Sequence, residues 1–153
     1  MKYLLLLFNI FYSCTVSANY NVIDGDSLEN EHERIRLQGI DAPEYPQMCW
    51  NAYEEEYHCG IKSLEFLKTL INNQKIDCNC EIKPDRYGRK LCECFVGNTN
   101  LNKEMVRNGW ALRYRTSKYK EDEQYAKKHL LGMWQGKFMR PALQRTLYRK
   151  NNK

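Results

Sequence analysis

The chain has 153 residues, of which 42% are hydrophobic and 12% aromatic, so it can form the core of one globular domain and is not a disordered chain. Its 24 Lys and Arg against 19 Asp and Glu give a net charge of +5, an excess that suits a polyanionic partner without requiring one. Past the first 18 residues, no apolar run has the ~20 residues of a spanning helix, which excludes a protein with several membrane spans.

Residues 1–18 have the pattern of a secretion signal. Lys2 precedes an apolar stretch over residues 3–12, and Val16 and Ala18 offer the small residues that a signal peptidase requires before a cut after Ala18. A retained anchor or a lipid attached to Cys14 are the alternatives. Cleavage removes 18 residues and one positive charge, leaving 135 residues with a net charge of +4. We expect the product to be secreted or periplasmic, without a stable membrane anchor.

Two strands and a helix are expected in the first half of the mature chain. Residues 19–23 and 34–40 are predicted to be strands, the second because apolar and polar side chains alternate along it. Apolar residues then recur at steps of three and four over residues 61–71. This spacing predicts an amphipathic helix that starts near Gly60.

An even number of cysteines follows the signal, which in an exported chain indicates disulfides. The six are Cys49, Cys59, Cys78, Cys80, Cys92 and Cys94. Within each of the last two pairs the sulfurs share one face of a strand, because strand side chains alternate. Antiparallel pairing about Arg86 sets Cys78 opposite Cys94 and Cys80 opposite Cys92, which leaves Cys49 to pair with Cys59. A zinc site built from the four hairpin thiolates is the alternative.

The second half of the chain is expected to contain a cysteine hairpin over residues 75–96 and two more helices, over residues 101–108 and from about residue 121 to Gly132. Five short strands with three helices indicate an α+β fold that is mainly β, a five-stranded OB-type barrel. We expect this domain to cover residues 19–140.

The positive charge is concentrated at the C-terminus. Residues 135–153 contain six Lys and Arg and no acid. We expect a basic tail over residues 141–153, which either holds phosphates loosely by counterion release or is a solvated end with no binding role.

Three short segments combine charged side chains with turn residues. The first is DGDS at residues 24–27, whose carboxylates can offer oxygen to a hard cation. The second is RLQGIDAPE at residues 36–44, and the third is the turn DRYGR at residues 85–89. Each by itself is compatible with a structural role. Together, in this order and spacing, they resemble the staphylococcal nuclease-like (thermonuclease) family, and the likeness extends over residues 22–134.

The resemblance implies a calcium site and a base. In the family, the positions of Asp26 and Asp41 bind a catalytic Ca²⁺ together with the main-chain carbonyl at Ala42. Calcium accepts six to eight oxygen ligands, including carbonyls and waters, so this donor set suits it. The family's general-base candidate, which orients or deprotonates the attacking water, falls on Glu44.

The resemblance also implies the residues that contact the substrate. Arg36 and Arg89 match the two arginines that clamp the scissile phosphate. Arginine suits this role because its planar fork can bond the extra charge of a pentacoordinate phosphorane bidentately. Further contacts to phosphate, sugar and base fall on Arg86, Tyr87, Tyr114 and Tyr119.

The function expected from this resemblance is a secreted, calcium-dependent nuclease that cuts DNA, and RNA as well, with little sequence preference and leaves 3′-phosphate ends. We expect a monomer with no obligate protein partner. The alternative is a non-catalytic OB-fold module that only binds nucleic acid, a role for which the family's acids and arginines need not survive. A disulfide-rich protein-interaction domain is a third class, and it leaves the charged motifs without a reason.

Overall fold

The structure, a computed structural model, describes residues 20–151. The predicted signal peptide at residues 1–18 lies outside these described residues.

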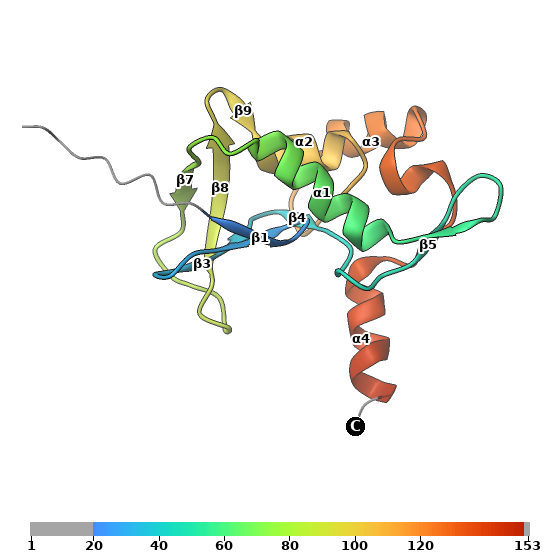
Figure 1. Ribbon diagram of the computed structural model, residues 1–153, viewed down its shortest axis with the longest axis horizontal. Coiled ribbons are helices and arrows are strands. Elements are labelled where there is room, and N and C mark those ends of the chain that lie inside the picture. The colour runs from blue at the N-terminus through green and yellow to red at the C-terminus, as the bar shows by residue number, and fades with distance from the viewer. Residues whose placement is uncertain (1–19, 152–153) are drawn as a thin grey trace, which may run out of the picture.

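A six-stranded open sheet forms the centre of the fold (Figure 1). Its strands are ordered β1-β2-β3-β8-β7, and β9 also pairs with β8. All neighbouring strands are antiparallel except β3 and β8, which run parallel. The bounds are β1 (Asn21–Asp24), β2 (Ser27–Glu29), β3 (Arg34–Leu37), β7 (Asp77–Cys80), β8 (Lys90–Val96) and β9 (Thr99–Asn100).

The predicted strand over residues 34–40 is broken in the structure. β3 ends at Leu37, and the chain turns at Gly39, whose φ of +75° is a conformation that L side chains rarely adopt. The next strand, β4 (Ile40–Asp41), leaves the sheet and pairs with β10 (Leu112–Arg113). The expected five-stranded barrel is therefore not seen, because the described strands form an open sheet that ends at β1 and β7.

The described residues contain four α-helices, whereas three were predicted for the chain. The predicted helices are α1 (Cys59–Ile71), α2 (Leu101–Arg107) and α3 (Lys120–Lys128), and a short 3₁₀ helix over Gly132–Gln135 follows. The fourth is α4 (Pro141–Asn151), formed by the basic segment that was expected to be a tail. Proline at its first position favours a helix start, because proline fixes φ at a helical value and lacks only an N–H that has no partner there.

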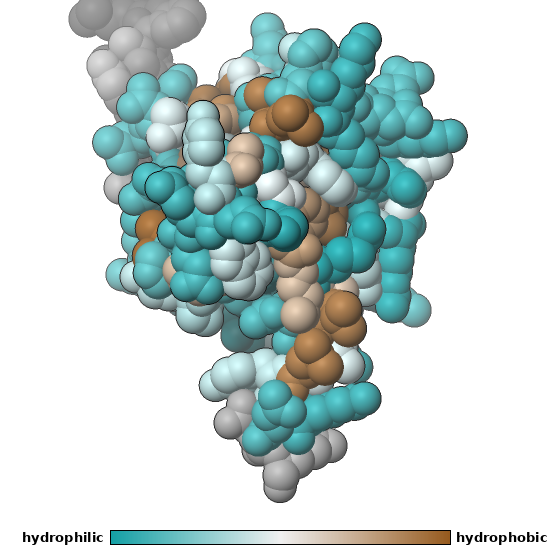
Figure 2. Space-filling model, turned by 90° about the vertical axis from the view of Figure 1, so that its right-hand side faces the viewer, coloured by the Kyte–Doolittle hydropathy of each residue, from teal (hydrophilic) through white to brown (hydrophobic). Residues whose placement is uncertain are grey.

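The position of α4 does not come from burial of its apolar side chains. Pro141 is its one buried residue, whereas Leu143, Leu147 and Tyr148 are exposed. Figure 1 shows α4 extending from the body of the molecule, and Figure 2 shows hydrophobic surface that continues from the body onto this end. Polar contacts, described below, therefore have to hold α4 in place.

The main core lies between the sheet and helices α1 and α2. The sheet contributes Leu28, Ile35 and Leu37, and the helices contribute Leu67, Leu101 and Met105, all buried. A smaller second cluster consists of Cys49, Cys59, Leu112 and Met133. Cys49 belongs to β5 (Cys49–Trp50), which pairs with β6 (Glu56–Tyr57) in a two-stranded ladder. No helix within residues 20–151 is long and apolar enough to span a bilayer.

The three disulfides join the pairs that the cysteine spacing predicts. β7 and β8 pair with Cys78 opposite Cys94 and Cys80 opposite Cys92, and both pairs are bonded. The third bond, Cys49–Cys59, links β5 to the start of α1. The hairpin bonds fix the strands on either side of the turn over residues 84–89, which carries part of the site.

We predict that the mature protein, cut after Ala18, contains no free thiol after denaturation, as measured with a thiol reagent. Replacing Cys49 and Cys59 together with alanine should lower the free energy of unfolding by about 2–4 kcal/mol, because the open chain regains the entropy of a short loop. Denaturant melts of the variant and the parent measure this loss. Four reactive thiols that accompany one equivalent of zinc would instead establish the zinc alternative.

Candidate active site

Two buried carboxylates share one guanidinium at the centre of the site. Arg36 Nη1 lies 2.7 Å from Asp26 Oδ1, and Arg36 Nη2 lies 3.1 Å from Asp41 Oδ1. Both aspartates are nearly inaccessible, at 1% and 2% exposure. The two oxygens therefore converge on one guanidinium, Asp26 from the turn between β1 and β2 and Asp41 from β4.

Local structure explains this convergence. In the turn after β1, Asp24 Oδ1 accepts a hydrogen bond from the Asp26 N–H at 2.9 Å, so Asp24 shapes the turn. Ser27 is directly opposite Arg36 in the β2–β3 ladder, which puts Asp26 beside the arginine. The turn at Gly39 then brings Asp41, at the end of β4, back to the same guanidinium.

Burial has the largest effect on the pKa values of Asp26 and Arg36. It raises the pKa of Asp26 well above its usual value, because a buried carboxylate loses its hydration, and Arg36 only partly opposes this. Burial also disfavours the charge on Arg36, but Asp26 and Asp41 outweigh it, and the pKa of Arg36 is raised.

Glu44 and Arg145 extend the cluster toward solvent. Arg145, on α4, donates from Nη2 to Asp41 Oδ1 at 2.6 Å and from Nη1 to Glu44 Oε1 at 2.9 Å. The Ala142 N–H, in the first turn of α4, donates to the other oxygen of Asp41 at 3.0 Å. These are the polar contacts that place α4.

Arg89 is oriented by its own turn. Its Nε and Nη2 both donate to Asp85 Oδ2, at 2.9 and 2.8 Å, and the Asp85 Oδ1 accepts the N–H groups of Tyr87 and Arg89. Burial opposes ionisation of Asp85, but these hydrogen bonds prevail and lower its pKa. Arg34 Nη2 donates to the Tyr87 carbonyl at 2.6 Å, which ties the turn to β3.

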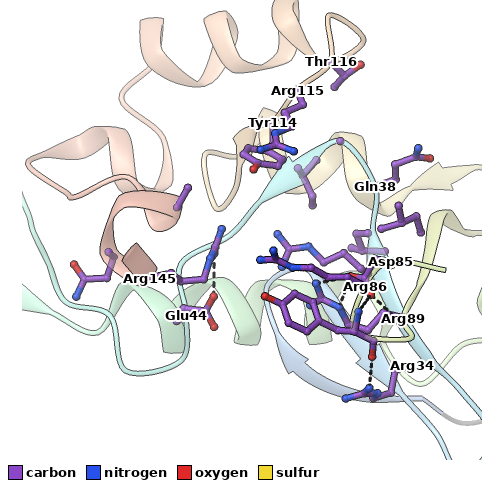
Figure 3. Close-up of a pocket in the computed structure, with 18 of the residues that line it drawn as sticks. Arg34, Gln38, Glu44, Asp85, Arg86, Arg89, Tyr114, Arg115, Thr116 and Arg145 are labelled. Carbon is purple, nitrogen blue, oxygen red and sulfur yellow. Dashed lines mark hydrogen bonds and ion pairs between the residues drawn. The ribbon is translucent and has the colours of Figure 1, made fainter. Parts of the chain in front are cut away.

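Arg36, Glu44, Arg145 and residues of the 84–89 turn line one cleft of about 1560 Å³. Figure 3 shows Glu44 and Arg145 on one side of the cleft, the residues of the 84–89 turn on another, and Tyr114, Arg115 and Thr116 above them. Its cationic side chains are Arg34, Arg36, Arg86, Arg89, Arg115, Lys118, Arg145 and Arg149. Its acidic side chains are Glu44, Asp85 and Glu93. The cleft is therefore strongly positive.

Most of the predicted site residues lie on this cleft. Those that line it are Arg36, Glu44, Arg86, Tyr87, Arg89, Tyr114 and Tyr119. Tyr119 is only 3% exposed, and its hydroxyl donates to Glu93 at 2.9 Å, so its ring belongs to the core as well. The three predicted metal-site residues, Asp26, Asp41 and Ala42, are buried behind the cleft wall.

The donor set around Asp26 and Asp41 fits a calcium ion. All its candidate donors are oxygens, as a hard cation prefers, and the Ala42 N–H donates to Asp26 Oδ2 at 2.7 Å, so this peptide adjoins the carboxylates. Burial raises the pKa of Asp26, and a cation bound beside it would offset part of that effect. Within residues 20–151, no three His, Cys, Asp or Glu side chains form a metal cluster, so carbonyl and water oxygens would have to complete the coordination of a bound ion.

The sequence analysis missed several residues of the cleft, four of which hold its parts together. Arg34 and Asp85 hold the 84–89 turn, and they lie in or next to recognised motifs. Arg145 and Arg149 lie on α4, four residues apart and thus on one helix face, and Arg149 Nη2 is 3.4 Å from the Tyr87 hydroxyl. The spacing of these two arginines after Pro141 was the available signal.

Comparison with known proteins identifies the same family. The family described as Staphylococcal nuclease homologue matches residues 34–136. The "Succinoglycan biosynthesis protein ExoI" of Rhizobium meliloti (strain 1021) is 33% identical over 119 residues, which are 74% of this chain and 62% of that protein. The "Probable endonuclease LCL3" of Uncinocarpus reesii (strain UAMH 1704) is 31% identical over 130 residues, 72% of this chain and 41% of that protein.

A "Thermonuclease" of Staphylococcus intermedius is 29% identical over 129 residues, which are 74% of this chain and 73% of that protein. The chain thus spans less than two thirds of the length of the Rhizobium and Uncinocarpus relatives. Because the family match covers more than half of the chain, including β3, β4, the 84–89 turn and α1 to α3, the chain belongs to the staphylococcal nuclease homologue family.

Proposed function

We propose that this protein is a calcium-dependent nuclease that hydrolyses the phosphodiester bonds of DNA and RNA. The observation that carries the proposal is the cleft in which Arg36, Arg89 and Glu44 lie together, in front of the carboxylates of Asp26 and Asp41. Relatives named thermonuclease and endonuclease support it.

The charge of the cleft matches a polyanion. Eight Lys and Arg side chains line it against three acids, so a nucleic-acid backbone would release counterions on entering. Guanidinium contacts to phosphates carry no base information. We therefore expect cleavage with little sequence preference.

Arg36 and Arg89 would act on the reacting phosphate. A phosphorane carries one more negative charge than the diester from which it forms, and planar guanidiniums can meet that charge with paired hydrogen bonds. Asp85 holds the Arg89 guanidinium through two nitrogens, so its direction is set before substrate arrives. Such preorganised donors stabilise a transition state because they need no reorientation.

Glu44 is the candidate base. Its carboxylate is partly exposed and borders the cleft, where it can accept a hydrogen bond from a water that attacks phosphorus. Calcium held by Asp26, Asp41 and the Ala42 carbonyl would supply positive charge to the phosphate oxygens. Departure of the 5′ oxygen gives the 3′-phosphate ends that the family resemblance implies.

A non-catalytic nucleic-acid-binding module is the second candidate. It is disfavoured because binding alone needs neither two buried aspartates around one arginine nor a carboxylate at Glu44. Export and action as a monomer stay predictions of the sequence. Digestion of single-stranded DNA, duplex DNA and RNA, each with calcium or with a chelator, separates the two candidates, because only the enzyme shortens the substrate.

The first prediction concerns the metal. Calcium should support cleavage and magnesium should do so poorly, because two carboxylates with carbonyl and water ligands form an irregular site, whereas magnesium requires a near-ideal octahedron. Initial rates in matched concentrations of the two ions measure this. Asp41→Asn, which removes a charged ligand, should need more calcium for half-maximal rate. Equal rates in both metals, or full activity in chelator, would contradict the assignment.

The second prediction concerns Arg89. Replacing it with lysine should lower kcat and kcat/KM together by about 10²–10³-fold, the size expected for one preorganised donor that acts in the transition state. The melting temperature should stay near that of the parent, because the Arg89 side chain is partly exposed on a turn and belongs to neither hydrophobic cluster. Steady-state kinetics and a thermal melt measure both.

Arg86→Lys is the matched control for this substitution. Arg86 lies on the same turn but is exposed, with its guanidinium over the Tyr87 ring at 4.7 Å. We expect it to raise KM with little change in kcat. An Arg89→Lys protein that melts early but cuts normally would make Arg89 a structural residue.

A further inference from the structure

Arg145 occupies the carboxylates to which the proposed function assigns metal binding and base catalysis. Its two terminal nitrogens bond Asp41 Oδ1 at 2.6 Å and Glu44 Oε1 at 2.9 Å (Figure 3). It comes from α4, 104 residues further along the chain than Asp41. The contact is therefore a tertiary one, made by the helix outside the matched family region, which ends at residue 136.

The backbone of α4 is fixed to the same aspartate. Asp41 Oδ2 accepts the Ala142 N–H at 3.0 Å, and one helical turn later Arg145 reaches Oδ1. Just before the helix, the Met139 carbonyl accepts a hydrogen bond from Gln47 Nε2 at 2.7 Å. Both oxygens of Asp41 accept hydrogen bonds from α4. The position of the helix therefore depends on what else binds this carboxylate.

The ion pair between Arg145 and Asp41 opposes the binding of a metal ion to Asp41. The Arg145 side chain is 23% exposed and the Asp41 side chain 3%, so solvent screens their attraction only partly. Burial disfavours the charge on Arg145, but the hydrogen bonds and charges of Asp41 and Glu44 outweigh it and raise its pKa. A metal ion that binds Asp41 has to share this oxygen with the guanidinium or displace it.

We propose that Arg145 is an internal cation that competes with calcium for Asp41, while its other nitrogen bonds Glu44, and that it thereby sets the calcium affinity of the site. This rests on the proposed function. A phosphodiester bound in the cleft presents anionic oxygens to the Arg145 guanidinium. The guanidinium can then bind the phosphate and leave the two carboxylates. Substrate and calcium should then strengthen each other's binding by the same factor, as thermodynamic linkage requires.

The test is a calcium titration by isothermal calorimetry on the disulfide-bonded protein. Arg145→Gln should bind calcium more tightly than the parent, on the order of tenfold, the usual range for a coupling between sites. Arg145→Lys keeps the charge but not the paired contact, so its calcium affinity should lie between those of the parent and Arg145→Gln. In the parent, a short phosphorothioate oligonucleotide should tighten calcium binding, and this effect should shrink in Arg145→Gln.

Lys150→Gln is the matched control. It removes the same charge from the same helix at an exposed position, and should leave calcium affinity within about twofold of the parent if the contact, and not the net charge, is responsible. One outcome is a parent that binds calcium and cuts DNA, with both Arg145 variants binding calcium no more tightly than it does. That result would contradict the proposed competition and leave the nuclease function standing. If the parent neither binds calcium nor depends on it for cleavage, the calcium function fails as well.

Discussion

Two buried carboxylates and one guanidinium form the contact on which the site depends. Asp26 lies in the β1–β2 turn, Arg36 on β3 and Asp41 on β4, so their ion pairs connect three segments at once. Removing one partner of a buried pair typically costs about 3–5 kcal/mol, because the remaining charge is left unpaired. Arg36 is thus needed for the fold around the site as well as for the proposed chemistry. Arg89, which is partly exposed on a turn outside the core, separates the two roles more cleanly.

The parallel pairing of β3 with β8 fixes where the two proposed phosphate-binding arginines lie. Arg36 is opposite Leu91 in this ladder, and Arg89 is two residues before Leu91, at the end of the turn. Three contacts hold that turn in place: the hydrogen bonds of Asp85, the hydrogen bond of Arg34 and the Cys80–Cys92 disulfide. The separation of the two guanidiniums is therefore set by a strand register and not by flexible side chains, which is the rigidity that electrostatic preorganisation requires.

Patterns that act over short distances were read correctly from the sequence. The cysteine spacing predicted the β7–β8 register, because side chains alternate with a fixed period of two. Apolar spacing predicted α1 and α2 to within one or two residues. Membership of the family implies an OB-type fold, yet the described strands form an open sheet, because the chain turns at Gly39 and β4 pairs with β10 instead of continuing β3.

The sequence by itself determined the family, the motif residues and the hairpin disulfides, since these follow from residue types at fixed local spacings. Only the tertiary structure decided that Asp26 and Asp41 lie buried behind the cleft and that α4 returns to them through Ala142 and Arg145. A basic segment with exposed leucines resembles a solvated tail when read alone. Its partners are carboxylates about 100 residues away, and a contact at that separation depends on how the whole chain packs and leaves no periodic pattern in the sequence.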